Sequence, residues 1–258
     1  AEAAYSTRQL RLAQTDCMVI LRASDSTTTT IGFDGSGNID EAAITTFCTG
    51  TTCSVQTWID QSGNGNNATQ ATAANQPTIY TGGAIVKENG NGKPAVKGTG
   101  NSFLTYSAQT FSGDFAFIGM QAFRINAAPY GGLAGNFGSV SLSSDLRWKL
   151  GGVNSTFSIP STSLDTPYLA FANRASNVLE VTFQGVSLGT LSNSGTAIFS
   201  QLMAGNGAGS LKFNGNSQET IFYSSDKSGT DQTSIEENIA DYFTQNTPLL
   251  DTYSGAAA

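Results

Sequence analysis

Short apolar runs separated by Gly, Asn and Ser fill the chain from about residue 76 to residue 224. In one run Leu179, Val181 and Phe183 alternate with Glu180 and Thr182, which is the two-residue period of a strand with one buried face. Many such runs with no long helix between them are typical of antiparallel β-sandwiches. The pattern predicts strands over residues 77–80, 94–97, 103–106, 114–125, 146–150, 167–173, 178–184, 197–204, 211–214 and 217–224.

The N-terminal part of the chain mixes strands with short helices. Ser6 and Gln9 have the spacing of a capping box, which predicts a helix near residues 6–13. Residues 40–47 predict a second helix, with acidic residues at the N-terminal end where the helix dipole favours them. Apolar and β-branched runs predict strands over residues 18–21, 27–33 and 54–59.

One amphipathic helix follows the last strand. Ile235, Ile239 and Phe243 recur every four residues and form one apolar stripe, which we expect to pack against the strands. Together these elements predict an all-β fold, namely a two-sheet antiparallel sandwich or jelly roll with short N-terminal helices and one C-terminal helix.

Composition narrows the classes of partner. Charged residues make up 12% of the 258 residues, and the formal net charge is −7. Nucleic acids and anionic membranes need clustered Lys and Arg, so neither is an expected partner. No apolar run approaches the roughly 20 residues of a membrane span. The neutral, polar composition is typical of an exported protein, and we expect an extracellular, secreted or virion-surface location.

The absence of histidine and the number of cysteines limit the chemistry further. With no His in the chain, histidine-based triads and His-ligated zinc are excluded. Cys48 and Cys53 are close enough to bridge a tight loop, and Cys17 is the odd one out. A disulfide suits the secreted-type composition, and a reduced pair is the alternative.

The stretch from Trp58 to Asn66 runs from an apolar strand into a turn of small and polar residues. It carries the carboxylate of Asp60 and the amides of Asn64 and Asn66, besides that of Gln61. Oxygen ligands at this spacing suit a calcium ion. The same turn could contact a sugar or only reverse the chain. No cofactor is required, and calcium is the one candidate.

Two further groups of side chains are candidates for function. Sugars are bound by aromatic faces together with planar polar groups, and the candidates of that kind are Tyr130, Trp148, Arg147, Asn154 and Asn136. Each could equally be part of the core or the surface. If the chain is an enzyme, catalysis falls to carboxylates, and the residues to test are Glu219, Glu180 and Asp226.

Several segments together resemble a concanavalin-like, laminin-G-like sandwich found in phage virion proteins and secreted bacterial proteins. They cover residues 4–10, 21–25, 58–66, 75–77, 213–219, 221–226 and 235–239. The resemblance spans nearly the whole chain and implies the sandwich fold. It implies little about activity, because one fold supports many functions.

The same segments are similar to the catalytic domain of fungal α-L-arabinofuranosidases. That family has a Phe-Cys-x4-Cys loop with bridged cysteines and the same Asp-Gln-Ser-Gly-Asn-Gly-Asn turn, which supports a Cys48–Cys53 bridge. Its acid/base aspartate corresponds here to Asn206, and the region of its nucleophile, residues 148–157, contains no acid. Glu219 matches a recurrent acid of the family. A retaining glycosidase needs two carboxyl groups about 5 Å apart, so the resemblance does not transfer the activity.

The two ends of the chain resemble consecutive segments at the start of this kind of domain. Residues 248–258 resemble the lead-in that precedes the Ala-Tyr-Ser start of this domain, and Ala4-Tyr-Ser6 stands at the other end. We therefore expect a domain over residues 1–247 and a tail or linker over residues 248–258, as in one unit of a tandem array that contacts copies of itself. An ordinary flexible tail is the alternative.

The sequence favours a non-catalytic extracellular or virion-surface module that recognises glycans or polysaccharides, or builds an assembly. One alternative is a glycoside hydrolase of arabinofuranosidase type, or a polysaccharide lyase, with rearranged catalytic carboxylates. A purely structural filament or capsid-decoration protein is the other.

Overall fold

The computed structural model describes residues 1–123, 167–203 and 214–243, and between them only the backbone of four short strands. This part of the chain is mainly antiparallel β-structure, with two α-helices and a 3₁₀ turn at Ala73–Asn75. The helices are α1 (Glu41–Cys48) and α2 (Thr230–Phe243). The strands are β1 (Ala3–Ser6), β2 (Asp16–Arg22), β3 (Thr28–Gly32), β4 (Cys53–Trp58), β5 (Ala68–Thr69), β6 (Thr78–Thr81), β7 (Ala84–Ile85), β8 (Val96–Thr99), β9 (Leu104–Phe111), β10 (Phe115–Phe123), β11 (Tyr130–Ala134), β12 (Phe137–Ser141), β13 (Trp148–Leu150), β14 (Val153–Ser155), β15 (Pro167–Ala175), β16 (Val178–Phe183), β17 (Val186–Ser192), β18 (Ala197–Leu202) and β19 (Asn214–Tyr223).

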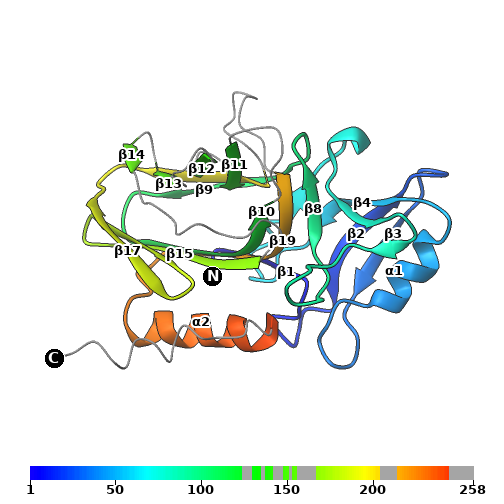
Figure 1. The fold of residues 1–258 in the computed structure, drawn as a ribbon, viewed down its shortest axis with the longest axis horizontal. Coiled ribbons are helices and arrows are strands. Elements are labelled where there is room, and N and C mark those ends of the chain that lie inside the picture. Colours follow the sequence, from blue (N-terminus) through cyan, green and yellow to red (C-terminus); the bar gives the residue numbers. More distant parts are fainter. Residues whose placement is uncertain are drawn as a thin grey trace.

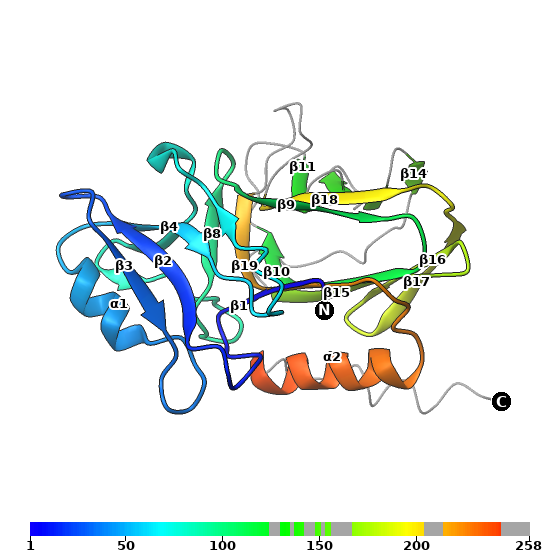
Figure 2. The ribbon, with the colours of Figure 1, turned by 180° about the vertical axis from the view of Figure 1, so that it is seen from behind.

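The strands lie in two stacked layers with α2 beneath them (Figures 1 and 2). The upper layer in these views contains β9 and β18, which pair with each other. In the lower layer β10 lies between β15 and β19, and β19 also pairs with β1. Each of these pairs is antiparallel, so the chain enters the lower layer at β1 and returns to it at β19.

Aromatic rings fill the space between the two layers. Phe199 of β18 lies nearly parallel to Phe117 of β10, with ring centroids 6.1 Å apart, and 4.8 Å from the ring of Phe222 on β19. Leu179 and Val181 extend this core from β16 and are fully buried. The alternation predicted for that strand is confirmed. Aromatic pairs of this kind stabilise by about 0.5–1.5 kcal/mol beyond their area burial, so these rings hold the layers together.

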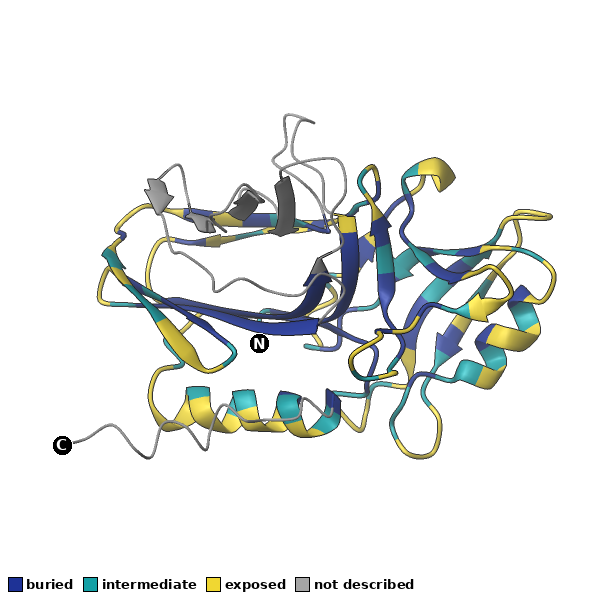
Figure 3. Cartoon of the chain, in the orientation of Figure 1, coloured by how far each residue is buried: buried dark blue, intermediate teal, exposed yellow. Residues whose placement is uncertain are grey.

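The outer face of the lower layer is covered by α2 (Figure 3). Ile239 and Phe243 of the helix are buried against Ile118 and Phe171, and Ile235 is partly buried beside them. The predicted apolar stripe is confirmed as core. Because both of its faces are covered, β10 is apolar at consecutive positions rather than at alternate ones.

The strands β2, β3 and β4 form a lobe with α1, on the right in Figure 1. The carboxylate of Asp40 accepts a hydrogen bond from the backbone N–H of Ala43 at 2.9 Å and caps the helix. Ile44 and Cys48 are the buried side chains of α1. The helix predicted over residues 40–47 is thereby confirmed.

The helix predicted near residues 6–13 is wrong. The backbone of Ala3–Ser6 pairs with β19 as strand β1, and the chain then turns. The Ser6 hydroxyl accepts from the backbone N–H of Arg8 at 3.0 Å and donates to Glu219 at 2.7 Å, so it does not cap a helix. Pairing with a distant strand outweighs the local capping signal.

The other predicted strands are confirmed to within a few residues where the structure describes them. Of the strand predicted over residues 211–214, residues 211–213 lie outside the described residues, and residue 214 begins β19. The pattern missed seven strands, which are β1, β5, β7, β11, β12, β14 and the polar strand β17. None of the helices formed by described residues is both long enough and apolar enough to cross a membrane.

Candidate functional site

The loop after β4 folds around the carboxylate of Asp60. Its Oδ1 accepts hydrogen bonds from the backbone N–H groups of Ala4 and Ser62, both at 2.9 Å. Its Oδ2 accepts from the Ser62 hydroxyl at 2.7 Å and from the backbone N–H of Asn66 at 3.0 Å. Gly63 has the positive φ of 92° that the turn requires. Since each carboxylate oxygen accepts about two bonds, protein donors already satisfy both oxygens of this side chain, which is only 3% exposed.

The amides of the same loop hold the N-terminal segment in place. Gln61 Nε2 donates to two backbone carbonyls of residues 6–8, each at 3.0 Å. Asn64 and Asn66 both donate to the carbonyl of Glu2, at 3.0 and 2.8 Å. No cluster of three or more His, Cys, Asp or Glu able to hold a metal occurs among the described residues. The geometry supports a structural turn, and calcium binding by Asp60, Asn64 and Asn66 stays a prediction.

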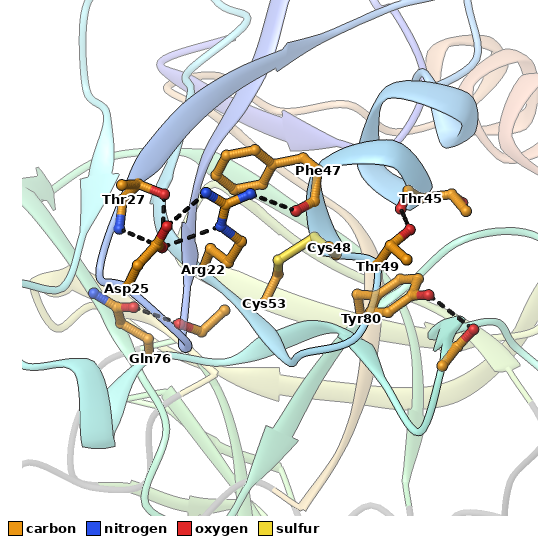
Figure 4. Close-up of a disulfide and its surroundings, with 12 residues drawn as sticks. Arg22, Asp25, Thr27, Thr45, Phe47, Cys48, Thr49, Cys53, Gln76 and Tyr80 are labelled. Atoms are coloured by element: carbon orange, nitrogen blue, oxygen red, sulfur yellow. Dashed lines mark hydrogen bonds and ion pairs between the residues drawn. A yellow bond between two sulfur atoms is a disulfide. The ribbon is translucent and has the colours of Figure 1, made fainter.

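A disulfide joins Cys48 at the end of α1 to Cys53 at the start of β4 (Figure 4). The Cα atoms are 5.9 Å apart, and the pairing implied by the family resemblance is confirmed. Cys17 is buried and unbridged. Beside the bridge, the guanidinium of Arg22 lies 4.6 Å from the ring centroid of Phe47 and donates to the Phe47 carbonyl. These contacts attach α1 to the neighbouring strands.

Glu219, the first carboxylate considered for catalysis, is fully buried in an ion pair. Arg8 donates to it through Nε at 2.7 Å and through a second guanidinium nitrogen at 2.9 Å. The Arg8 guanidinium also donates to the carbonyl of Asn238 and lies 5.2 Å from the ring centroid of Tyr242. The pair therefore fixes α2 and the segment that follows β1 to β19, and both oxygens of Glu219 are engaged.

Glu180 lies on the outer face of β16, where the structure brings it near a carboxylate that the sequence analysis did not select, Glu236 of α2. Glu180 accepts from the Ser187 hydroxyl at 2.6 Å. Glu236 Oε1 accepts from Thr182 Oγ1 and from Gln232 Nε2, both at 3.0 Å. Burial raises the pKa of Glu236, and the negative charge of Glu180 raises it further. A signal was present in the sequence, since Glu236 stands next to an apolar position of the stripe.

Asp226 lies in the turn between β19 and α2. Its Oδ1 accepts from Asn173 Nδ2 at 2.6 Å and from the backbone N–H of Ser228 at 2.9 Å. Partial burial opposes ionisation, but these bonds outweigh it and the pKa of Asp226 lies below its ordinary value. The structure does not bring Asp226, Glu180 and Glu219 together as one carboxylate site. Each has a separate set of protein partners.

The predicted sugar-binding residues fall outside the part of the chain that the structure describes in full. The backbones of Tyr130, Trp148 and Asn154 lie in β11, β13 and β14. Their side chains, and Arg147 and Asn136 entirely, are outside the described residues, as is Asn206. Glycan binding by this group stays a prediction.

A cavity of about 460 Å³ lies where α2 faces β1, β19 and the loop after β4. Four segments that are distant in sequence contribute to it, so no local motif could have indicated it. The residues that line it are Ala1, Ala4, Arg8, Leu10, Arg11, Gln61, Ser62, Ile221, Tyr223, Ser234, Ile235, Asn238 and Ile239.

Sequence comparison places the N-terminal part of the chain beside one enzyme family. Residues 1–111 match a family model described as "Alpha-L-arabinofuranosidase B, catalytic". A stretch of 51 residues is 53% identical to α-L-arabinofuranosidase B of Aspergillus niger and 55% identical to that of Aspergillus kawachii. This stretch is 19% of the chain and 10% of each relative. The similarity therefore concerns a small part of much longer proteins.

Comparison of structures extends the similarity to most of the chain. An arabinofuranosidase in complex with arabinofuranosyl-α-1,2-xylobiose superposes with a TM-score of 0.70 and 21% identity, over 92% of this chain and 62% of that one. A Trypanosoma rangeli sialidase superposes with a TM-score of 0.51 and 13% identity, over 72% of this chain and 31% of that one. At these identities the likeness concerns the fold. The chain is thus similar to arabinofuranosidase catalytic domains in sequence over residues 1–111 and in fold over most of its length.

Proposed function

We propose that this chain acts on carbohydrate outside the cell, as a glycoside hydrolase of arabinofuranosidase type whose substrate is a polysaccharide with arabinofuranosyl side groups. One observation carries the proposal: the sequence match over residues 1–111 and the structural match over 92% of the chain point to the same catalytic domain. A fold shared over most of the chain brings the same scaffold, and glycans are what the related protein holds in its complex.

Other features support parts of this proposal. The two stacked layers support a concanavalin-like jelly roll. The Cys48–Cys53 disulfide supports an oxidising, extracellular compartment. The composition, poor in charge and rich in neutral polar residues, supports a partner held by hydrogen bonds rather than by strong electrostatic attraction.

A second candidate is glycan recognition without hydrolysis, and the distribution of carboxylates favours it. Glycosidases need two carboxyl groups about 5 to 9.5 Å apart, both directed at the sugar. Glu219 is instead neutralised by Arg8. Asn206 stands where the resemblance places the acid/base aspartate, and an amide cannot donate a proton to a leaving group.

Release of arabinose decides between the two candidates. The purified chain is incubated with arabinoxylan and with 4-nitrophenyl α-L-arabinofuranoside, and retention on immobilised arabinoxylan is measured in parallel. Turnover that is lost in Glu180→Gln or Asp226→Asn, with folding intact, supports the hydrolase and identifies an acid. Retention without turnover supports recognition alone. Neither turnover nor retention would overturn both candidates.

A further inference from the structure

The cavity between α2 and the lower layer has an apolar floor and a polar rim. Ala4, Ile221 and Ile239 are buried and form the floor between the sheet and the helix. Ser234 and Asn238 stand on the exposed side of α2 at its rim. A cavity of about 460 Å³ lies within the range of small-molecule sites, which combine apolar walls with a few polar groups.

The polar rim has unused hydrogen-bonding capacity. Within the described part of the chain, the hydroxyl of Ser234 and the side-chain amide of Asn238 have no hydrogen-bond partner, although the Asn238 carbonyl accepts from Arg8. An alcohol and a primary amide one helical turn apart offer donors and acceptors in the same direction. Sugar hydroxyls require such mixed groups.

The charge of the cavity comes from Arg11. The other arginine of its lining, Arg8, is neutralised by Glu219 at 2.7 Å. Arg11 donates once, to the carbonyl of Ser62 at 2.8 Å, and no carboxylate among the described residues forms an ion pair with it. That bond and the backbone of Gly63 hold the guanidinium over the loop, where a Cβ at position 63 would lie 2.0 Å from it. A positioned guanidinium with free N–H groups is the usual partner of a carboxylate.

We propose that this cavity is a binding site for a carboxylate-bearing sugar, that is, for a uronic acid residue. The carboxylate bonds to Arg11, the ring hydroxyls bond to Ser234 and Asn238, and the apolar face of the ring lies on Ile221 and Ile235 beside the ring of Tyr223. The choice of a sugar over another carboxylate rests on the proposed carbohydrate function, whereas Arg11 alone calls for the carboxylate. The site lies under the outer face of the lower layer, so it is separate from the space between the layers.

The test uses D-glucuronic acid and D-glucose, which differ only in the carboxylate at C6. Each is titrated into the ¹⁵N-labelled full chain, with acetate as the carboxylate that lacks a sugar ring. We expect glucuronate to shift the backbone amides of Ser234, Asn238 and Gln61 and to bind at least about tenfold more tightly than glucose or acetate, because a charge-assisted bond and the ring contacts act together. Equal affinity for glucose would overturn the role of the carboxylate, and equal affinity for acetate would overturn the role of the sugar.

Variants locate the site. Arg11→Gln is expected to weaken glucuronate binding about tenfold, and Arg11→Lys less, because lysine keeps the charge but not the planar fork. Arg22→Gln, which removes a partly exposed arginine outside the cavity, is the control and should bind glucuronate as the wild type does. Ser234→Phe should block the cavity. Unchanged affinity in both Arg11→Gln and Ser234→Phe would overturn the proposal.

Arabinose release by the wild type separates this inference from the proposed function. Glucuronate binding without arabinose release leaves the cavity site standing while the hydrolase fails. Arabinose release without glucuronate binding overturns the cavity site and leaves the hydrolase standing.

Discussion

Residues 1–111 and the strands that follow them differ in their main side-chain contacts, although Arg174 bonds backbone carbonyls in the second part and Tyr5 packs on Trp58 in the first. In the first part, side chains bond the backbone: the carboxylate of Asp60 accepts four hydrogen bonds, and Gln61 holds the segment after β1. From β10 onward the layers are joined by rings, with Phe117, Phe199 and Phe222 in mutual contact. The sequence match to the arabinofuranosidase domain ends at residue 111, whereas the structural match continues.

The difference explains how far each kind of similarity extends. A buried carboxylate with four donors tolerates few replacements, because any other side chain leaves some donors unsatisfied. An apolar core tolerates exchanges that keep its volume and pattern. Sequence can therefore diverge in the ring-packed part while the fold persists, and the hydrogen-bonded part remains recognisable.

The largest effect is expected where the two parts meet, at Glu219→Gln. Arg8 comes from the first part and Glu219 from the second, and the pair is buried with an N–O distance of 2.7 Å. Glutamine leaves the Arg8 charge uncompensated, so the free energy of unfolding should fall by about 3–5 kcal/mol. Urea denaturation followed by tryptophan fluorescence measures the change.

A double variant is the control for that experiment. Arg8→Met with Glu219→Leu removes both charges and keeps most of the volume. Its free energy of unfolding should lie closer to that of the wild type than the value for Glu219→Gln does. A double variant less stable than the single one would contradict the ion-pair explanation.

Asp60→Asn is expected to cost about 2–3 kcal/mol of unfolding free energy, although the two side chains have nearly the same shape. The asparagine amide places an NH₂ donor opposite backbone N–H groups from which the carboxylate accepted hydrogen bonds, so those N–H groups lose their acceptor. Asp16→Asn, at an exposed carboxylate, is the matched control and should change stability by less than about 0.5 kcal/mol. Similar losses in both variants would remove the special role of the loop.

The same pair of variants tests calcium. Because protein donors satisfy both oxygens of Asp60, we expect the Tm of the wild type to be equal with calcium and with a chelator. A rise in Tm with calcium that is absent in Asp60→Asn would show instead that the loop binds the ion.

Phe199→Leu should cost less than Asp60→Asn, about 1–1.5 kcal/mol, although it removes more atoms. Phe199 is surrounded by rings that can close part of the space it leaves. Ile198→Ala, at the neighbouring side chain that is 41% exposed, should cost less than about 0.5 kcal/mol. A loss for Phe199→Leu larger than that for Asp60→Asn would reverse the comparison between the two parts.

What could be predicted from the sequence follows the same division. The period of two at Leu179, Val181 and Phe183 identified β16 because burial of one face needs no knowledge of the partner strand. The helix expected near residues 6–13 failed because the hydroxyl of Ser6 bonds Glu219, which lies 213 residues away. The Asp60 loop was recognised as a turn, but the donor that β1 supplies, the Ala4 N–H, depends on a tertiary contact. The cavity between α2 and the lower layer is lined by four separate segments, so no local pattern contains it.

The smallest expected effect concerns how the helix α2 rests on the sheet, and it depends on pH. Burial, with the charge of Glu180, holds the pKa of Glu236 above its ordinary value of 4.5. A carboxyl group whose pKa is higher in the folded than in the unfolded protein stabilises the fold at pH values below the unfolded pKa. That stabilisation is lost as the pH rises through the folded pKa. Glu236→Gln does not ionise, and its Oε1 can still accept from Thr182 and Gln232. The free energy of unfolding of the variant should therefore equal that of the wild type near pH 4 and exceed it by up to about 0.5 kcal/mol at neutral pH.

Urea denaturation from pH 4 to pH 7 measures the difference, with Glu237→Gln on the exposed side of α2 as control. A difference that does not grow with pH would show that α2 rests on the sheet without this burial penalty.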